Sequence, residues 1–363
     1  MVPELDLNAA QVALDRGQLV SALASARAWL APSGREPALR LQALRVRAVA
    51  AFRLGELGEA ADAAGQWLAA CARDPADDKP RLDVLGVSVV AAGELARYEQ
   101  ALEHLRLMLG AASRAGSLAD FVRGRGTAAI LFALLGDPWA AQRLLSELAG
   151  MFQAGAGETR LEATVRNNHA SVCLQTARLA RLGGDASGCE DALEHAQASI
   201  ERARELLPSI VDPRGRAFAH VHAAELKLLR GEGDAALELL ADAVTQADTA
   251  QLWAHARQLR LLEAEVQLLR GDTAAARRCL AAVAERLDVG HELGARVRCH
   301  EHLHRVHLAD GELADALAEA ELARALGAYR QYRQSKAQSQ HLRTRLELEH
   351  LYRYRGTAAR STR

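Results

Sequence analysis

The densest group of side chains that could do chemistry is a run of histidines near the end of the sequence. Residues 300–307 read His-Glu-His-Leu-His-Arg-Val-His. On a helix, His300, His304 and His307 would share one face, because they are four and three residues apart. Imidazoles at this spacing are suited to Zn²⁺ or a similar metal. A metal-dependent enzyme is therefore one hypothesis, which the repeat pattern described below disfavours.

Three common catalytic or nucleotide-binding motifs are absent from the sequence. The sequence contains no G-x-x-x-x-G-K-[ST] phosphate loop, no G-x-G-x-x-G dinucleotide fingerprint and no G-x-S-x-G nucleophile elbow. Each of these patterns serves a defined chemistry: cradling phosphates, approaching a pyrophosphate, or exposing a nucleophilic serine. We therefore predict a non-catalytic protein with no catalytic residue, no cofactor and no bound metal.

The composition predicts an almost wholly helical chain. Of 363 residues, 50% are hydrophobic and only 4% aromatic, and eight are proline. Alanine, leucine, arginine, glutamate and glutamine dominate, and all are good helix formers. The formal net charge of −1 gives no support to a nucleic-acid-binding domain, which is usually strongly basic. The longest apolar stretch, around residues 84–92, is far shorter than the ~20 residues of a membrane helix, so we expect no membrane partner.

The cysteines and the first residues of the sequence indicate in which cellular compartment we expect the protein. Five cysteines are widely spaced and form no C-x-x-C pair. This pattern is typical of neither a disulfide framework nor a zinc site, and it fits a reducing compartment. The first residues, Met-Val-Pro-Glu-Leu-Asp, lack the basic start of a signal peptide. We expect a cytoplasmic protein.

Glycine-containing breaks recur between apolar helical stretches at intervals of 38 to 48 residues. Each interval has room for two helices and short turns. We predict first helices at about 4–16, 37–54, 80–93, 117–135, 158–182, 213–230, 249–270 and 291–309. We predict second helices at about 18–31, 58–73, 97–114, 138–152, 189–207, 234–247, 273–287 and 312–353. The breaks are centred on Gly17, Gly55, Gly93, Gly136, Gly183, Gly231, Gly271 and Gly311.

Small residues at fixed distances from the breaks support the repeat. In five units an alanine stands seven residues before the turn glycine and another stands five residues after it. Two antiparallel helices joined by a tight turn approach most closely beside that turn, so each needs a small side chain there. Glycine suits the turn because it adopts the left-handed conformation without steric cost. The alanine pairs are Ala10 and Ala22, Ala48 and Ala60, Ala129 and Ala141, Ala224 and Ala236, and Ala264 and Ala276.

These helix–turn–helix units resemble tetratricopeptide (TPR) repeats over roughly residues 4–325. Residues 224–237, Ala-Glu-Leu-Lys-Leu-Leu-Arg-Gly-Glu-Gly-Asp-Ala-Ala-Leu, are among the closest stretches. Residues 93–102 also fit, with Ala96 in the usual glycine place and Tyr98 in the usual tyrosine place. Most units are longer than the family's repeat, and residues 183–188 form an apparent insertion. The resemblance implies an all-α, right-handed α-solenoid of about eight hairpins over residues 1–325, like the long-repeat TPR proteins of bacterial regulators.

The same register assigns candidate binding residues. First helices line the concave side of such a solenoid, and mixed apolar and charged residues there suit an extended peptide or a helix. Asn167 and Asn168 add amides that both donate and accept hydrogen bonds, although they could equally bond near a helix start. His304 falls where other units have the small packing residue, which favours packing over metal binding. The candidate residues are Asn167, Asn168, Phe218, Glu225, Gln258, Glu265, Arg298, Glu301, His302 and Arg305.

Helical composition continues past the last repeat, over residues 326–355, before a predicted disordered tail at 356–363. Residues 324–363 hold ten Arg or Lys against two Glu. Three interpretations stay open: a solvated capping helix, a coiled-coil or signalling helix that pairs two protomers, or a disfavoured nucleic-acid contact through Arg and Tyr. Residues 326–351, notably 342–350, resemble the connector between TPR sensor regions and the output domains of GGDEF-type diguanylate cyclases. The GGDEF loop itself does not follow, so cyclase activity is not implied.

Two further functional hypotheses accompany the metal enzyme. The favoured one is a scaffold whose concave groove binds a protein or peptide segment, with a homodimer formed through the C-terminal helix. The alternative is the sensory part of a bacterial signalling protein, of the GGDEF or helix-turn-helix type, whose output domain is missing.

Overall fold

The chain folds as an array of antiparallel helical hairpins. The structure is a computed structural model, and it describes residues 7–31, 36–71, 78–153, 158–209, 213–285, 287 and 293–309. These residues form fifteen α-helices and one short 3₁₀ turn, and they include no strand. The prediction of an all-α solenoid is confirmed.

Seven complete hairpins and the first helix of an eighth are described. The first helices are α1 (Leu7–Asp15), α3 (Pro37–Leu54), α5 (Asp78–Glu94), α7 (Leu118–Leu134), α9 (Thr159–Leu182), α11 (Pro213–Leu229), α13 (Trp253–Leu269) and α15 (Leu293–Ala309). The second helices are α2 (Leu19–Leu30), α4 (Leu57–Cys71), α6 (Tyr98–Ala115), α8 (Pro138–Gln153), α10 (Ala186–Leu206), α12 (Gly233–Thr249) and α14 (Thr273–Ala284). The 3₁₀ turn, η1 (Leu207–Ser209), follows α10.

The predicted packing beside each turn is confirmed. All ten alanines of the five pairs are between 0% and 1% exposed. Gly17, Gly55, Gly136, Gly231 and Gly271 have positive φ, between 75° and 91°. Each of these glycines donates its backbone N–H to a carbonyl near the end of the preceding helix. For Gly55 the acceptor is the Phe52 carbonyl oxygen, at 3.1 Å from the Gly55 nitrogen.

Two of the predicted turn glycines are wrong. Gly93 lies inside α5, where it packs against side chains of α7. Ala96 takes the left-handed position with φ of 59°, as its match to the usual glycine place predicted. Gly183 keeps a negative φ, and Gly184 takes the left-handed position at 75°. The second half of the expected insertion is helical, because the Asp185 carboxylate accepts a hydrogen bond from the Gly188 N–H and starts α10 at Ala186.

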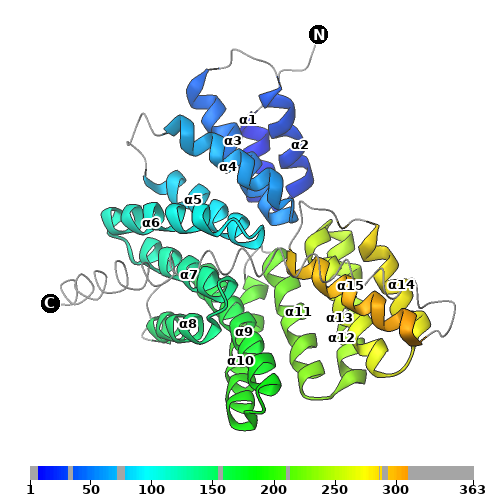
Figure 1. Cartoon of the computed structure of the whole chain (residues 1–363). Helices are drawn as coiled ribbons and strands as arrows, with labels where there is room; N and C mark the ends of the chain where they lie inside the picture. The colour runs from blue at the N-terminus through cyan, green and yellow to red at the C-terminus, as the bar shows by residue number, and fades with distance from the viewer. Residues whose placement is uncertain are drawn as a thin grey trace.

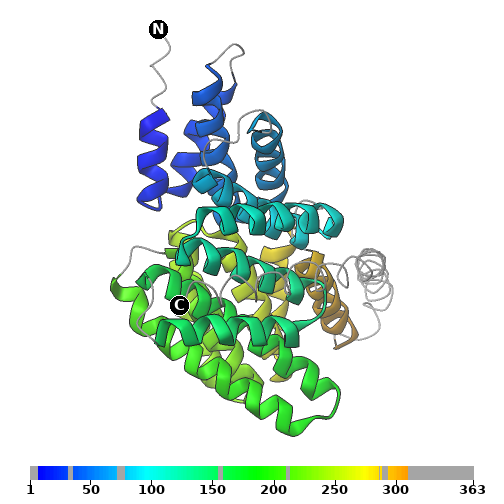
Figure 2. The same ribbon diagram turned by 90° about the vertical axis from the view of Figure 1, so that its left-hand side faces the viewer.

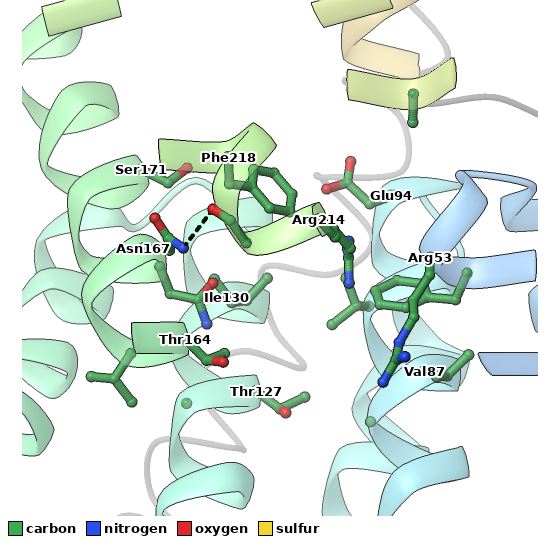
Figure 3. A pocket seen from close by; sticks show the side chains of 18 of the residues that line it. Arg53, Val87, Glu94, Thr127, Ile130, Thr164, Asn167, Ser171, Arg214 and Phe218 are labelled. Carbon is green, nitrogen blue, oxygen red and sulfur yellow. Dashed lines mark hydrogen bonds between the residues drawn. The ribbon is translucent and has the colours of Figure 1, made fainter. Parts of the chain in front are cut away.

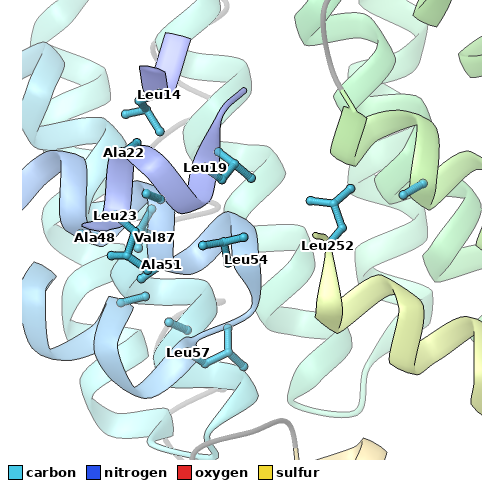
Figure 4. Packing of buried hydrophobic residues seen from close by; sticks show 14 of the residues in the cluster. Leu14, Leu19, Ala22, Leu23, Ala48, Ala51, Leu54, Leu57, Val87 and Leu252 are labelled. Atoms are coloured by element: carbon cyan, nitrogen blue, oxygen red, sulfur yellow. The ribbon is translucent and has the colours of Figure 1, made fainter. Parts of the chain in front are cut away.

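The hairpins stack in sequence and curve until the second hairpin meets the seventh. Figure 1 shows α1–α4 above α11–α15, and Figure 2, seen from the side, shows α5–α10 stacked in layers below α1–α4. Leu54 and Leu57 belong to the same hydrophobic cluster as Leu252, which faces them in Figure 4. A Cβ added at Gly55 would collide with the Cβ of Ala254. We name these five residues the closure contact; they close the solenoid into a ring.

Some predictions fall outside this description. The expected extended helix at 326–355, the tail at 356–363 and the second helix of the eighth hairpin lie beyond the described residues. Among the described helices, none combines the length and the apolar character that crossing a bilayer requires.

Candidate functional site

A cavity of about 770 Å³ lies at the centre of the ring. The first helix of every hairpin contributes to its wall, from Gln11 of α1 to Arg298 of α15. Figure 3 shows Asn167 and Phe218 on one side of this space and Arg53 and Val87 on the other. Because the closure contact brings the second hairpin against the seventh, residues far apart in sequence line one cavity, which stays partly open to solvent.

Helix α9 presents a row of uncharged polar side chains to the cavity. Thr164, Asn168, Ser171 and Gln175 all line it. Their spacing of four, three and four residues places them on one helix face. Thr164 and Ser171 are exposed, and Asn168 and Gln175 are half-buried. These four residues, the α9 polar stripe, offer hydrogen-bond donors and acceptors without net charge.

Asn167 stands beside the stripe and joins two hairpins. Its side chain is only 5% exposed, and its Nδ2 donates to the Gly215 carbonyl at 3.1 Å. Its Oδ1 is buried in the cavity wall without a hydrogen-bond partner. An unsatisfied buried oxygen costs about 1–3 kcal/mol, so this atom is a candidate ligand contact.

Helix α11 contributes a second row, centred on Phe218. Arg214, Phe218 and His222 are four residues apart on one face and line the cavity. The Phe218 ring stacks on His222 with centroids 5.7 Å apart and meets His255 of α13 edge-on at 4.3 Å. The guanidinium carbon of Arg214 lies 5.1 Å from the Phe218 centroid and 4.5 Å from that of Phe52 in α3. This cluster therefore bridges α3, α11 and α13 beside the closure contact.

The two histidines of this cluster are held neutral. Burial lowers the pKa of His222 to about 4, against a smaller opposing effect of Glu225. Burial also lowers the pKa of His255 well below its usual range, and Arg214, His222 and Arg257 lower it further. The Nδ1 atom of His222 and both ring nitrogens of His255 are buried without a hydrogen-bond partner. They are polar atoms that a ligand in the cavity could satisfy.

Charged residues tie the later hairpins together at one end of the cavity. The Arg178 guanidinium of α9 donates to Glu225 of α11 at 2.7 Å and to Glu265 of α13 at 3.1 Å. Burial lowers the pKa of Arg178, but the two carboxylates raise it more, so the net shift is upward. His302 of α15 is buried close by, and burial lowers its pKa to about 4.

The structure brings most, though not all, of the predicted residues to the cavity. The wall includes Asn167, Asn168, Phe218, Glu225, Gln258 and Arg298. Glu265 pairs with Arg178 and is not part of the lining, and His302 is buried with both ring nitrogens unpartnered. Glu301 and Arg305 are exposed and are not part of the lining. Sequence reasoning missed Phe52, Arg214, His222 and His255, and only the spacing of 214, 218 and 222 hinted at a shared face.

The histidine run lies on α15 as expected. His300, His304 and His307 are all half-buried. Residues 300–304 also match the H-E-x-x-H pattern of zinc metalloproteases, which the sequence analysis overlooked. Within the described part of the chain, no three or more His, Cys, Asp or Glu side chains are grouped to hold a metal ion. The match to the pattern therefore has no geometric support.

One further group with chemical potential lies away from the cavity. The exposed Ser146 of α8 has its Oγ 2.9 Å from Nε2 of His169 in α9, whose Nδ1 is 2.7 Å from the Oγ of buried Ser199 in α10. Burial lowers the pKa of His169 to about 4. A neutral imidazole that bonds to both serines links three helices, and we interpret it as a structural connection.

Comparison with known proteins bears on the fold. No family model matches the chain, and no curated protein matches its sequence. A Rap protein, solved in complex with competence and sporulation factor, is similar in structure, with a TM-score of 0.55, 12% identity and coverage of 91% of this chain and 98% of its own. The apo form of RapI has a TM-score of 0.50 and 12% identity over 81% of this chain and 97% of its own. The chain has the fold of a helical-repeat solenoid.

A third structure is similar at a lower score. A tetratricopeptide repeat protein from Parabacteroides merdae has a TM-score of 0.46 and 15% identity, and the match covers 84% of this chain and 97% of that one. At these identities the likenesses bear on the fold alone. The function therefore has to be argued from the cavity itself.

Proposed function

We propose that this protein binds a short, extended peptide in the central cavity and that it acts by binding, without catalysis. The observation that carries the proposal is the α9 polar stripe, which lines the cavity. An extended peptide has a backbone N–H and C=O at every residue, and side-chain amides and hydroxyls can pair with both. A row of such groups along one helix suits a chain that lies alongside it.

The size of the cavity limits the occupant. A volume of about 770 Å³ lies within the range of about 300–1,000 Å³ that is typical of small-ligand pockets. A folded domain is far larger than this volume, so the cavity suits a short segment of chain better than a globular partner. The bound factor in the similar Rap structure is consistent with a solenoid of this kind holding a partner.

The lining also suits a peptide of mixed character. Val49, Val87, Ile130 and Leu161 provide apolar wall beside the polar stripe. Alternate side chains of an extended peptide point to opposite sides. One set could therefore pack on this apolar wall while the backbone bonds to α9.

The test is affinity selection from a library of short synthetic peptides. Ser171→Trp puts a large side chain into the cavity at an exposed stripe position, whereas Gln246→Trp puts the same side chain on the exposed surface of α12. We expect the unaltered protein and Gln246→Trp to retain a common set of peptides and Ser171→Trp to lose them. Equal retention of the peptides by all three proteins would contradict binding in the cavity.

The roles predicted for other parts of the chain remain proposals. A homodimer formed through residues 326–355, a sensory role in a signalling protein and a cytoplasmic location all depend on parts or properties outside the described structure. The peptide-binding proposal requires none of them.

A further inference from the structure

We propose that the cavity contains a subsite for a peptide carboxylate at Arg214, where α3, α11 and α13 meet. This inference rests on the proposed peptide-binding function and names the chemical group by which the peptide is anchored. Three independent features of this corner support it: how Arg214 is held, which charges surround it, and which polar atoms lie next to it.

Two aromatic rings fix the side chain of Arg214. Its guanidinium carbon is 4.5 Å from the Phe52 centroid and 5.1 Å from the Phe218 centroid. A guanidinium is planar and carries its N–H donors along the edge of that plane, while aromatic rings attract its face. Two parallel N–H groups match the two oxygens of a carboxylate. The rings come from α3 and α11, so the approach of the second hairpin to the sixth holds this arginine.

The side chains whose charges lower the pKa of His255 at this corner are cationic or can become so. His255 lies in the wall beside Phe218 and is 3% exposed. The groups that influence its ionisation are Arg214, His222 and Arg257, and each of them disfavours a further positive charge there. Positive charge near a buried side chain attracts an anion, because burial weakens the screening by water.

Unpartnered polar atoms lie at the same place. Both ring nitrogens of His255 and Nδ1 of His222 lack a hydrogen-bond partner, and the two side chains are 97% and 96% buried, respectively. A neutral imidazole has one N–H to donate. With the guanidinium, these histidines could surround an oxyanion with donors from α11 and α13.

The lining favours a single negative charge. Glu94 and Glu225 also line the cavity. A dianion such as a phosphate would be repelled by these carboxylates more strongly than a carboxylate would. The peptide could supply the group either from its C-terminus or from an Asp or Glu side chain, and the experiment separates these sources.

The experiment uses the full-length protein and three libraries of short peptides. The first lacks Asp and Glu and has a free C-terminal carboxylate, the second is the same library with a C-terminal amide, and the third is amidated but contains Asp and Glu. We expect the first or the third library to be retained roughly tenfold better than the second, which is the scale of a charge-assisted hydrogen bond. Whichever of the two is retained identifies the source of the carboxylate.

Variants assign the effect to Arg214. Arg214→Gln should abolish the preference for carboxylate-bearing peptides, and Arg214→Lys, which keeps the charge but loses the planar fork, should weaken it. Arg143→Gln, at an exposed position on α8, should leave it unchanged. The comparison of libraries on the unaltered protein does not depend on the folding of any variant.

The outcomes separate the two proposals. Equal retention of all three libraries would overturn the carboxylate subsite and leave peptide binding standing. Retention of none would contradict the proposed function itself. Displacement of the retained peptides by inorganic phosphate but not by acetate, at equal concentration, would overturn the assignment of a carboxylate in favour of phosphate.

Discussion

Gly55, in the turn between α3 and α4, lies directly against Ala254 in the first turn of α13. This contact joins the second hairpin to the seventh, and it turns an open array into a ring with an interior. Only glycine fits at position 55, since its φ is 85° and the Ala254 methyl group occupies the space of a side chain. The cavity, and the peptide site proposed in it, depend on this closure.

Enlarging Ala254 should open the ring. Ala254→Leu adds bulk against Gly55 at a position that is 6% exposed, and overpacking of this kind costs about 1–3 kcal/mol of unfolding free energy. Urea denaturation measures the loss, and small-angle scattering should show a larger radius of gyration. Ala250→Leu, at an exposed position on the same connection, is the matched control. If neither the radius of gyration nor the free energy of unfolding changed, Gly55 and Ala254 would not be in contact in solution.

Acid should destabilise the fold through its buried histidines. His169 and His222 have pKa values lowered to about 4 by burial, against about 6.5 when unfolded. Between these values the unfolded chain binds more protons than the folded one, so stability is complete above pH 6.5 and falls as the pH drops towards 4. Each histidine contributes on the order of 2–3 kcal/mol to this loss.

Urea midpoints at several pH values test that expectation. His222→Phe removes one titrating group and should flatten the decline below pH 6.5, whereas Arg143→Gln, at an exposed position on α8, should keep the decline of the parent protein. A free energy of unfolding that stays constant from pH 7 to pH 4.5 would contradict the burial of neutral histidines.

Arg178 should stabilise the later hairpins more than surface ion pairs do. Arg178→Met leaves the half-buried Glu225 and Glu265 without their shared cation, and bonds to charged groups are worth about 1.5–3 kcal/mol. Arg270→Met breaks a pair with Asp234 that is mostly in solvent and should cost under about 1 kcal/mol. Thermal denaturation of both variants gives the comparison, and similar losses would argue against the network.

Ala96→Gly should stabilise the protein. Ala96 has φ of 59°, a left-handed conformation that costs an L-residue about 1 kcal/mol and costs glycine almost nothing. The control, Ala198→Gly at an exposed position inside α10, should instead lose about 1 kcal/mol. Loss of stability in both variants would show that the turn at Ala96 is not left-handed.

The sequence predicted the repeats well because their determinants are local. The alanines at fixed distances from the turns, such as Ala48 and Ala60, report directly on close helix packing, and they are fully buried. In the third hairpin the break was centred wrongly on Gly93, which packs against α7, whereas the match of Ala96 to the usual glycine place was right, since Ala96 adopts the left-handed conformation.

The site was predicted only in part because it depends on ring closure. Asn168, Phe218 and Gln258 follow from the rule that first helices face inward, and they line the cavity. The approach of Phe52 to Arg214 joins the second and sixth hairpins, and nothing in either local sequence encodes it. The curvature accumulated over several hairpins produces that contact, and a periodic pattern does not report curvature.

The most direct test of peptide binding is to locate the bound peptide. Peptides selected on the unaltered protein would carry a benzophenone group, be cross-linked by light, and be mapped by mass spectrometry. The account predicts adducts on residues of α9 and α11 that line the cavity, such as Ser171 and Phe218. Adducts confined to the outer helices α8, α10 and α12 would contradict it.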